Sequence, residues 1–235
     1  MSVSVERSAA DQATAGCHPA DHATTGCPTA DRTTAGRAPG AVRLRPLGVV
    51  DAVPYRAFRL AALRETPSAF TSSHAEEAGK PLSATLDRLA AAEAGPGALI
   101  GAFDGAGELV GTAGLKVPRR SQERHKGTLY GMAVARGAGG RGIGRALVRE
   151  VLRTAARDGG LRQVLLTVSE GNERALRLYT ACGFEVWGRE PQAVVVDGLA
   201  VAKLHMVCLL DAEPAGEEPR AFTTAPDGGP PATVP

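Results

Sequence analysis

The stretch MAVARGAGGRGIGRAL, residues 132–147, is the part of this 235-residue chain that decides how the rest is interpreted. A short apolar strand ending near Val134 runs into five glycines within eight residues, and an amphipathic helix follows at once. Glycines let the backbone approach a ligand with its N–H groups unobstructed, and a helix N-terminus adds four unpaired donors and about half a positive charge. The stretch therefore predicts an anion-binding turn, and phosphate is the usual anion there.

Two nucleotide-binding patterns were compared with this turn. A P-loop needs Gly-Lys followed by Ser or Thr, and neither tripeptide occurs in the chain. The dinucleotide pattern G-x-G-x-x-G fails in the registers that begin at Gly140 and Gly142, because Arg145 and Leu147 stand where the last glycine is needed. The sequence thus weakens both nucleotide interpretations.

A second patterned segment, VSEGNERALRLYTACGF, covers residues 168–184 and follows an apolar strand. It matches N-x-x-A-x-x-[LF]-Y-x-x-x-G-F at Asn172, Ala175, Leu178, Tyr179, Gly183 and Phe184. With the glycine turn, this segment resembles the GNAT superfamily of acyl-CoA-dependent N-acetyltransferases, whose pyrophosphate loop follows [QR]-x-x-G-x-[GA]. Gly139 stands where the family has Gln or Arg, which removes one side chain but leaves the backbone donors. The resemblance covers about residues 42–210.

The hydrophobic pattern predicts the order β-α-α-β-β-β-α-β-α-β-β, which is a mixed α/β fold with flanking helices. Expected strands cover residues 42–45, 98–103, 108–116, 128–134, 161–168, 194–196 and 201–210. The resemblance implies a mostly antiparallel central sheet whose strands 128–134 and 161–168 splay apart at the acyl-CoA site. Val53, Ala57, Leu60 and Ala61 are expected to line the inner face of the first helix.

Composition divides the chain into three parts. Residues 1–41 carry a degenerate ten-residue repeat with few large apolar side chains, and we expect them to be disordered. Residues 42–211 form the expected acetyltransferase domain, and residues 212–235 an expected disordered tail rich in Ala, Pro, Gly and Glu. Cys17, His18, His22 and Cys27 in the repeats could be drawn as a zinc site, but no second closing pair follows, so we expect no metal.

Charge and hydropathy exclude several classes of protein. The formal net charge is +2, and no basic cluster with interleaved aromatic residues suggests binding to nucleic acid. No apolar run approaches the ~18 residues that span a bilayer, and no secretory signal is recognisable. The four cysteines are sparse and unpatterned. We therefore expect a cytoplasmic protein with no membrane or nucleic-acid partner.

The resemblance implies that acetyl-CoA is the acyl donor, that backbone N–H groups near Met132 or Val134 polarise the thioester carbonyl, and that Tyr179 protonates the leaving thiolate. The alternative role of Tyr179 is that of a core residue on an apolar helix face. Arg141 and Arg145 either contact CoA phosphates or are surface charges. The expected acetyl-CoA contacts are Met132, Ala133, Val134, Gly139, Gly140, Arg141, Gly142, Ile143, Gly144, Arg145, Asn172, Ala175 and Tyr179.

The general base stays open at the level of sequence. The candidates are His125, Glu123 and the pair Glu76 and Glu77, and water could relay the proton instead. His205 is expected to pack in or beside the last strand. Cys182 is expected to be an inert core thiol, because no histidine lies near it in sequence.

Two functions are carried forward. The first is an N-acetyltransferase acting on a small-molecule or peptide amine by direct attack, with Phe70 and the Glu76/Glu77 segment forming one wall of the acceptor site. The second is an acyl-CoA-binding sensor or interaction module without transfer activity. Either protein is expected to be a monomer or a homodimer.

Overall fold

The computed structural model describes residues 42–157 and 160–210, and in them the strands form one open sheet of seven. The sheet order is β1-β2-β3-β4-β5-β7-β6, and every neighbouring pair is antiparallel except β4 and β5. This confirms the predicted mixed, mostly antiparallel α/β fold. The strands are β1 (Arg43–Pro46), β2 (Ala98–Phe103), β3 (Leu109–Lys116), β4 (Lys126–Val134), β5 (Gln163–Ser169), β6 (Glu185–Val196) and β7 (Leu199–Leu209).

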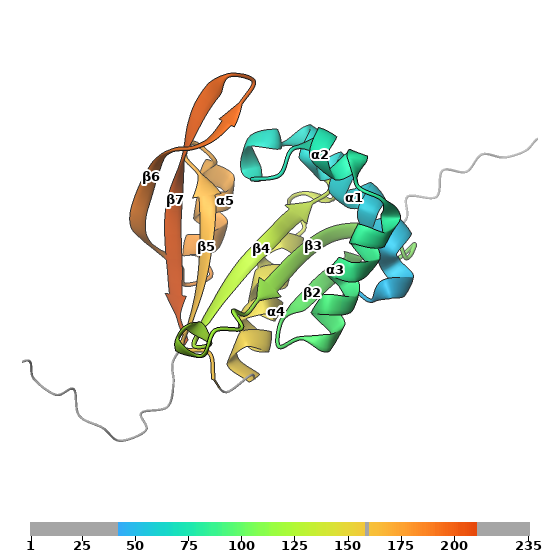
Figure 1. Cartoon of the computed structure of the whole chain (residues 1–235), viewed down its shortest axis with the longest axis horizontal. Helices are drawn as coiled ribbons and strands as arrows, with labels where there is room; N and C mark the ends of the chain where they lie inside the picture. The colour runs from blue at the N-terminus through green and yellow to red at the C-terminus, as the bar shows by residue number, and fades with distance from the viewer. Residues whose placement is uncertain (1–41, 158–159, 211–235) are drawn as a thin grey trace, which may run out of the picture. The chain divides into compact units, whose positions relative to one another are not determined.

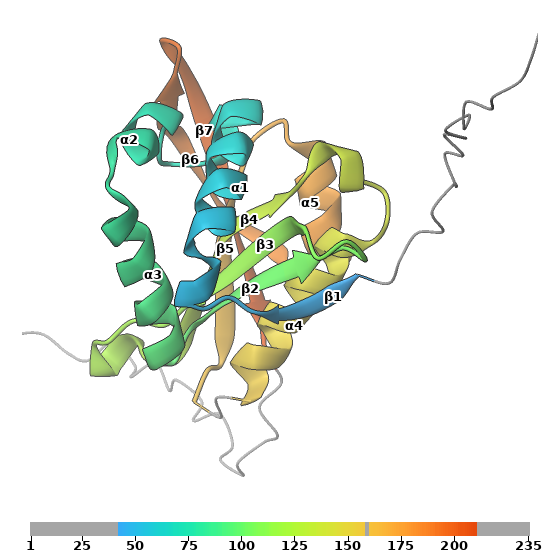
Figure 2. The same cartoon turned by 90° about the vertical axis from the view of Figure 1, so that its right-hand side faces the viewer.

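Helices cover both faces of the sheet (Figures 1 and 2). On one face lie α1 (Ala52–Glu65), α2 (His74–Gly79) and α3 (Leu82–Ala94), and on the other lie α4 (Ile143–Arg157) and α5 (Glu173–Thr180). The α4 face predicted from helical spacing is buried, at Ile143, Leu147, Val148, Val151 and Ala155. Burying a Leu or Val side chain contributes about 1.5–3 kcal/mol, so this face fixes α4 against the sheet.

The parallel strands β4 and β5 pair over a short length only. Their register runs from Lys126↔Gln163 to Thr128↔Leu165, although β4 continues to Val134. The register with β3 also shifts beside Gly131, whose φ of +61° marks a bulge in β4. The two strands therefore diverge beyond Thr128, as Figure 1 shows, and the predicted splay of the sheet is present.

The predicted inner face of α1 was wrong. Val53 is 66% exposed, whereas Tyr55 and Leu63 are buried. Apolar residues occur around most of this helix, so spacing alone did not single out one side. The orientation is set by tertiary contacts: Tyr55 packs into a small cluster with Leu99, and Arg59 pairs with a residue of α2.

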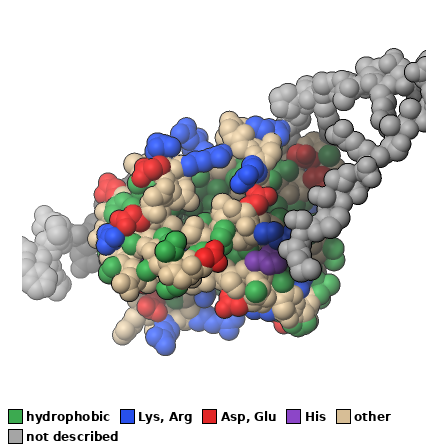
Figure 3. Space-filling view, turned by 90° about the horizontal axis from the view of Figure 1, so that it is seen from above, with side chains coloured by type: hydrophobic (Ala, Val, Ile, Leu, Met, Phe, Trp, Pro, Cys, Tyr) green, Lys and Arg blue, Asp and Glu red, His purple; other side chains and the backbone are tan. Residues whose placement is uncertain are grey.

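The surface seen from above carries interspersed acidic, basic and apolar side chains (Figure 3). This agrees with a formal net charge of only +2 for the whole chain. Within residues 42–157 and 160–210, no helix has the length and apolar character needed to cross a bilayer.

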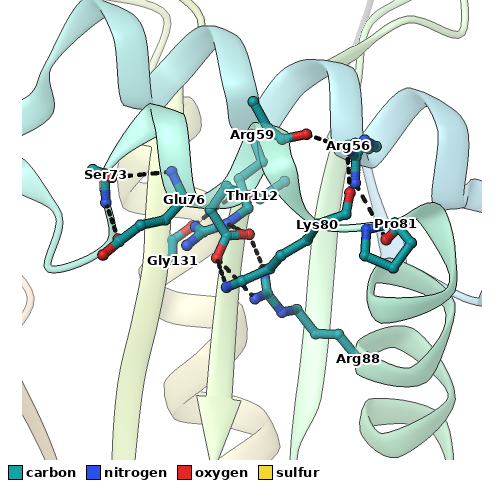
Figure 4. Close-up of polar contacts among 11 residues, drawn as sticks. Arg56, Arg59, Ser73, Glu76, Lys80, Pro81, Arg88, Thr112 and Gly131 are labelled. Atoms are coloured by element: carbon teal, nitrogen blue, oxygen red, sulfur yellow. Dashed lines mark hydrogen bonds and ion pairs between the residues drawn. The ribbon is translucent and has the colours of Figure 1, made fainter.

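The short helix α2 is an addition to the predicted order of elements. Ser73 Oγ accepts a hydrogen bond from the Glu76 N–H at 3.2 Å, and the Glu76 carboxylate accepts one from the Ser73 N–H at 2.9 Å (Figure 4). This is a capping box, and its S-x-x-E pattern is readable in the sequence. The helix was overlooked because it is only six residues long.

Candidate functional site

The glycine-rich turn joins β4 to α4 at the end where β4 leaves β5. A single 3₁₀ turn, Arg136–Ala138, leads into the glycines. Gly140 and Gly142 have φ values of +79° and +75°, which L-residues with a Cβ rarely adopt. No atom lies within 4 Å of a Cβ built on either glycine, so their conformation, not crowding, requires glycine here. The turn leaves backbone N–H groups and the α4 N-terminus open to an anion.

The dinucleotide interpretation fails on the fold. The register that begins at Gly137 does fit G-x-G-x-x-G, at Gly137, Gly139 and Gly142, a match that the sequence comparison overlooked. That motif serves open, mostly parallel sheets with helices on both faces. Here β4 is antiparallel to β3, and its parallel pairing with β5 is short. The sheet therefore excludes a doubly wound nucleotide-binding fold.

A cavity of about 580 Å³, here called the glycine cavity, opens along this turn. Its walls come from the end of β4, the glycines, β5, α5 and the segment after α1. Arg141 is exposed and lies outside its lining. The predicted acetyl-CoA contacts that the glycine cavity brings together are Met132, Ala133, Val134, Gly139, Gly140, Gly142, Ile143, Gly144, Arg145, Asn172, Ala175 and Tyr179.

Arg174, which the sequence analysis did not predict as a site residue, lies beside Gly139, the position that departs from the family pattern. A Cβ on Gly139 would stand 2.8 Å from Arg174 Nη2 on α5, so the guanidinium occupies the space in front of this glycine. Arg174 also lines the glycine cavity. The side chain missing at position 139 is thus matched by a guanidinium from another element.

A second cavity of about 460 Å³, here called the hairpin cavity, is lined by residues 128–132 of β4 and 165–167 of β5, where the two strands diverge. The β6–β7 hairpin contributes Trp187, Lys203 and His205, and α1 contributes Arg59. The residues that line both cavities are Ala69, Phe70, Met132, Thr167 and Tyr179. The two cavities therefore meet in the gap between β4 and β5.

Tyr179 lies where the cavities meet. The Asn172 side chain accepts a hydrogen bond from the Ala175 N–H at 3.1 Å and so begins the helix that carries the tyrosine. The Tyr179 ring is 6% exposed and meets Phe184 edge-on at 5.9 Å. Burial, and to a lesser extent Cys182, raises the pKa of Tyr179 to about 12. Its phenol is therefore protonated at neutral pH and can act as a proton donor.

His125 and Glu123 lie outside both cavity linings. His125 directly precedes β4, and its carbonyl accepts hydrogen bonds from the N–H groups of Arg162 and Gln163. Met132 is seven residues further along, about 23 Å for an extended strand. The structure thus does not bring His125 to Tyr179.

Glu76 and Glu77 also lie outside the two linings, whereas Phe70 lines both cavities. Lys80 and Arg88 converge on the Glu77 carboxylate at 2.6 and 3.4 Å, between α2 and α3 (Figure 4), and Arg59 reaches it at 3.3 Å. Burial alone would raise the pKa of Glu77, but the Lys80 and Arg88 hydrogen bonds and the charges of Arg88 and Arg59 lower it to about 2. Such a carboxylate is a weak base.

His205 had been expected only to pack beside the last strand, but its side chain lines the hairpin cavity. Its Nε2 lies 2.8 Å from the Glu190 carboxylate, and its ring meets Trp187 edge-on at 5.4 Å. No local motif surrounds this histidine. Only the pairing of β6 with β7, which brings Glu190 opposite Lys203, reveals the arrangement.

The described residues offer neither a metal site nor, at Cys182, an activated thiol. Among the described residues, no group of three or more His, Cys, Asp or Glu side chains could hold a metal ion. The drawn zinc site, with Cys17 and His22, lies outside the described residues. Burial raises the pKa of Cys182, which makes this thiol less reactive.

The structure has the sheet parted between two parallel strands and the glycine turn at the parting that the resemblance to acyl-CoA-dependent acetyltransferases implied. Residues 60–184 match the acetyltransferase (GNAT) family. The chain therefore belongs to the GNAT family of acetyltransferases.

Individual relatives agree with this membership. A mycothiol acetyltransferase from Frankia casuarinae is 42% identical over 118 residues, which cover 45% of this chain and 33% of that protein. The chain thus spans about a third of the length of this curated relative. Among solved structures, a GNAT-family acetyltransferase from Streptococcus pneumoniae matches with a TM-score of 0.65 at 22% identity, over 72% of this chain and all of that one. A phosphinothricin acetyltransferase from Sinorhizobium meliloti, solved with acetyl-CoA, matches with a TM-score of 0.63 at 21% identity, over 77% and 94%.

Proposed function

We propose that this protein transfers the acetyl group of acetyl-CoA to a primary amine by direct attack. The observation that carries the proposal is the meeting of two cavities at Tyr179. One cavity contains the glycine turn, and the other is lined by both polar and apolar residues, among them Arg59, Lys203 and His205. A cofactor and an acceptor that entered from opposite sides would react in the gap between β4 and β5.

The glycine cavity is proposed to hold the cofactor. Backbone N–H groups of residues 139–144 would bind the pyrophosphate, and Arg174 would add a positive charge beside Gly139. The Ala135 N–H donates to Val110 O at 2.9 Å, toward β3. Because N–H directions alternate along a strand, the N–H of Val134 would face the gap instead. We propose that this N–H, or that of Met132, polarises the thioester carbonyl, a contribution of about 3–4 kcal/mol where such donors have been removed.

The chemical steps follow from this placement. The neutral amine nitrogen attacks the carbonyl carbon of the thioester, and the backbone N–H groups bind the oxygen of the tetrahedral intermediate. The C–S bond then breaks, and Tyr179 donates its proton to the departing sulfur. The products are the N-acetylated amine and free CoA, and the proton lost by the amine returns Tyr179 to its neutral form through solvent.

A base must take the amine proton, and His205 is the residue we propose for it. An imidazole nitrogen can accept a proton, and a carboxylate bonded to the other nitrogen fixes the orientation of the ring. Glu190 provides that contact, and His205 lines the hairpin cavity. His125 and Glu77, the candidates from the sequence, lie outside this lining.

The test is an assay that detects free CoA thiol with acetyl-CoA and a panel of amines. Because a relative is named mycothiol acetyltransferase, the panel includes the amine precursor of mycothiol. Amine-dependent thiol release, with acetylated product seen by mass spectrometry, supports the proposal. Binding of acetyl-CoA without release on any amine would instead support a sensor or interaction module.

A further inference from the structure

The hairpin cavity is lined by two cationic side chains and by no carboxylate. Arg59 reaches it from α1 and Lys203 from β7. The outer surface seen in Figure 3 mixes acidic with basic groups, so a lining of one sign is a local feature of this cavity. The motif residues and the proposed acetyl transfer do not account for these two charges.

The charge of Arg59 is only partly compensated. Its Nε lies 3.3 Å from the Glu77 carboxylate, but Lys80 and Arg88 share that same carboxylate. Three cations and one anion leave a net charge of +2 in this cluster. The Arg59 side chain is 15% exposed, so water screens it little. An anion in the cavity would be attracted to this cluster.

Lys203 is the more deeply buried of the two cations. It is 5% exposed, and its Nζ donates to Thr71 Oγ1 at 3.0 Å. Burial lowers the pKa of Lys203, although the charge of Glu190 opposes this. Glu190 itself is bonded to His205 and is half-exposed. The ammonium is therefore poorly solvated in the folded protein, and a bound anion would restore part of what it loses.

We propose that the acceptor amine carries a carboxylate, and that Arg59 and Lys203 bind this group while the amine points toward Tyr179. The proposal rests on the proposed acetyl transfer and names its substrate class, which is a free amino acid or a closely similar amino carboxylate. A cavity of about 460 Å³ has room for such a molecule. Guanidinium and ammonium groups are the usual partners of carboxylates in binding sites.

The experiment compares free L-amino acids with their carboxamides as acceptors, at saturating acetyl-CoA. Amide formation removes the negative charge and leaves the amine in place. We expect kcat/KM for the preferred amino acid to exceed that of its amide by about 10-fold or more. In Lys203→Met and in Arg59→Gln the ratio should fall toward one, through a higher KM for the acid, with the KM for acetyl-CoA unchanged.

Arg64→Gln is the matched control. It removes another cation from α1, but Arg64 lies outside the cavity lining and does not pair with Glu77. It should leave the acid-to-amide ratio as in the wild type. A wild-type enzyme that prefers the amides, or a ratio that neither Arg59→Gln nor Lys203→Met changes, would overturn the proposal while the acetyl transfer stands.

A binding measurement covers the case in which no amine is acetylated. Protein saturated with CoA is then titrated with the same amino acids and amides in a calorimeter. Tighter binding of the acids, weakened by Lys203→Met, supports the carboxylate site even though the proposed transfer has failed. Equal or absent binding of both members of each pair contradicts the carboxylate site.

Discussion

The glycine cavity and the hairpin cavity share Tyr179 and Phe70, but the chain builds them in different ways. The glycine cavity is lined largely by two short continuous segments, residues 132–145 and 167–179, with a smaller contribution from residues 62–70. The hairpin cavity is lined by residues from α1, the segment after it, β4, β5, α5, β6 and β7. The glycine cavity therefore depends mainly on local structure, whereas the hairpin cavity depends on the tertiary fold.

This difference between the two cavities would separate cofactor binding, which is general, from acceptor selection, which is specific. A site that binds through backbone N–H groups, as proposed for the glycine cavity, would accept any ligand with the right phosphate and thioester and would depend on glycine conformation more than on side chains. A side-chain site changes with every substitution on its walls, so it can select an acceptor while the same cofactor is kept. Four predictions test the division, from the largest expected effect to the smallest.

Loss of the Tyr179 hydroxyl, which lies where the two cavities meet, should have the largest effect on turnover. Tyr179→Phe removes the proton donor but keeps the ring that packs on Phe184, so kcat should fall roughly 100-fold while acetyl-CoA affinity is kept. Steady-state kinetics and calorimetry measure the two quantities. Tyr55→Phe, which removes a buried hydroxyl outside both linings, is the control and should retain kcat. Equal turnover in wild type and Tyr179→Phe at all pH values would exclude Tyr179 from the mechanism.

The hairpin side should be the more acid-sensitive one, because the carboxylate of Glu77 pairs with Arg59, one of the two cations that line the hairpin cavity. The pKa of Glu77 falls from 4.5 to about 2 on folding, so its stabilisation is complete above about pH 5 and is lost as pH falls toward 2. Glu77→Gln should lower the free energy of unfolding by roughly 2–3 kcal/mol at pH 7 and by less at pH 3. Urea unfolding at both pH values measures this.

Glu76→Gln is the control for this second prediction. Glu76 is adjacent to Glu77 and exposed, and it closes the capping box of α2. Its substitution should change the pH dependence of stability less than Glu77→Gln does. A Glu77→Gln variant whose stability deficit is as large at pH 3 as at pH 7 would show that the charge of Glu77 is not the cause.

Glycine conformation should matter only on the cofactor side. Gly142→Ala forces a Cβ onto a residue with φ of +75°, which costs about 1–2 kcal/mol, and the turn would relax away from its binding conformation. We expect the KM for acetyl-CoA to rise about 10-fold. Gly107→Ala places the same strain, at φ of +82°, in the β2–β3 hairpin and should leave that KM unchanged. Equal effects of the two substitutions would indicate general destabilisation.

Arg174 should make the smallest of these contributions, because it is an exposed charge. Arg174→Gln should raise the KM for acetyl-CoA about 3-fold, and the increase should shrink at high salt. Arg177→Gln, one turn along the same helix and outside the cavity lining, provides the control. If both substitutions act alike, Arg174 has no specific role at Gly139.

The sequence predicted the glycine cavity better than the hairpin cavity. The strand, turn and helix around the glycines were predicted, since helical spacing and glycine patterns are local signals. Twelve of the thirteen expected contacts line one cavity, all but Arg141. The inner face of α1 was wrong and α2 was overlooked, because tertiary contacts set the first and six residues make a weak signal for the second.

The hairpin cavity could not be predicted, for a physical reason. Lys203, which lines this cavity, meets Thr71 across 132 positions of sequence. Such contacts depend on strand register and on the path of the segment after α1, neither of which periodicity encodes. In the sequence, His205 and Arg59 therefore look like ordinary strand and helix residues. Only the folded structure brings both of them to the same cavity.

The measurement closest to the central claim is calorimetric titration of the full-length protein with acetyl-CoA. Binding at one site per chain in the micromolar range, weakened in Gly142→Ala but not in Gly107→Ala, is the predicted result. No detectable binding of acetyl-CoA or of any other acyl-CoA would contradict the account, for the transferase and for the sensor alike.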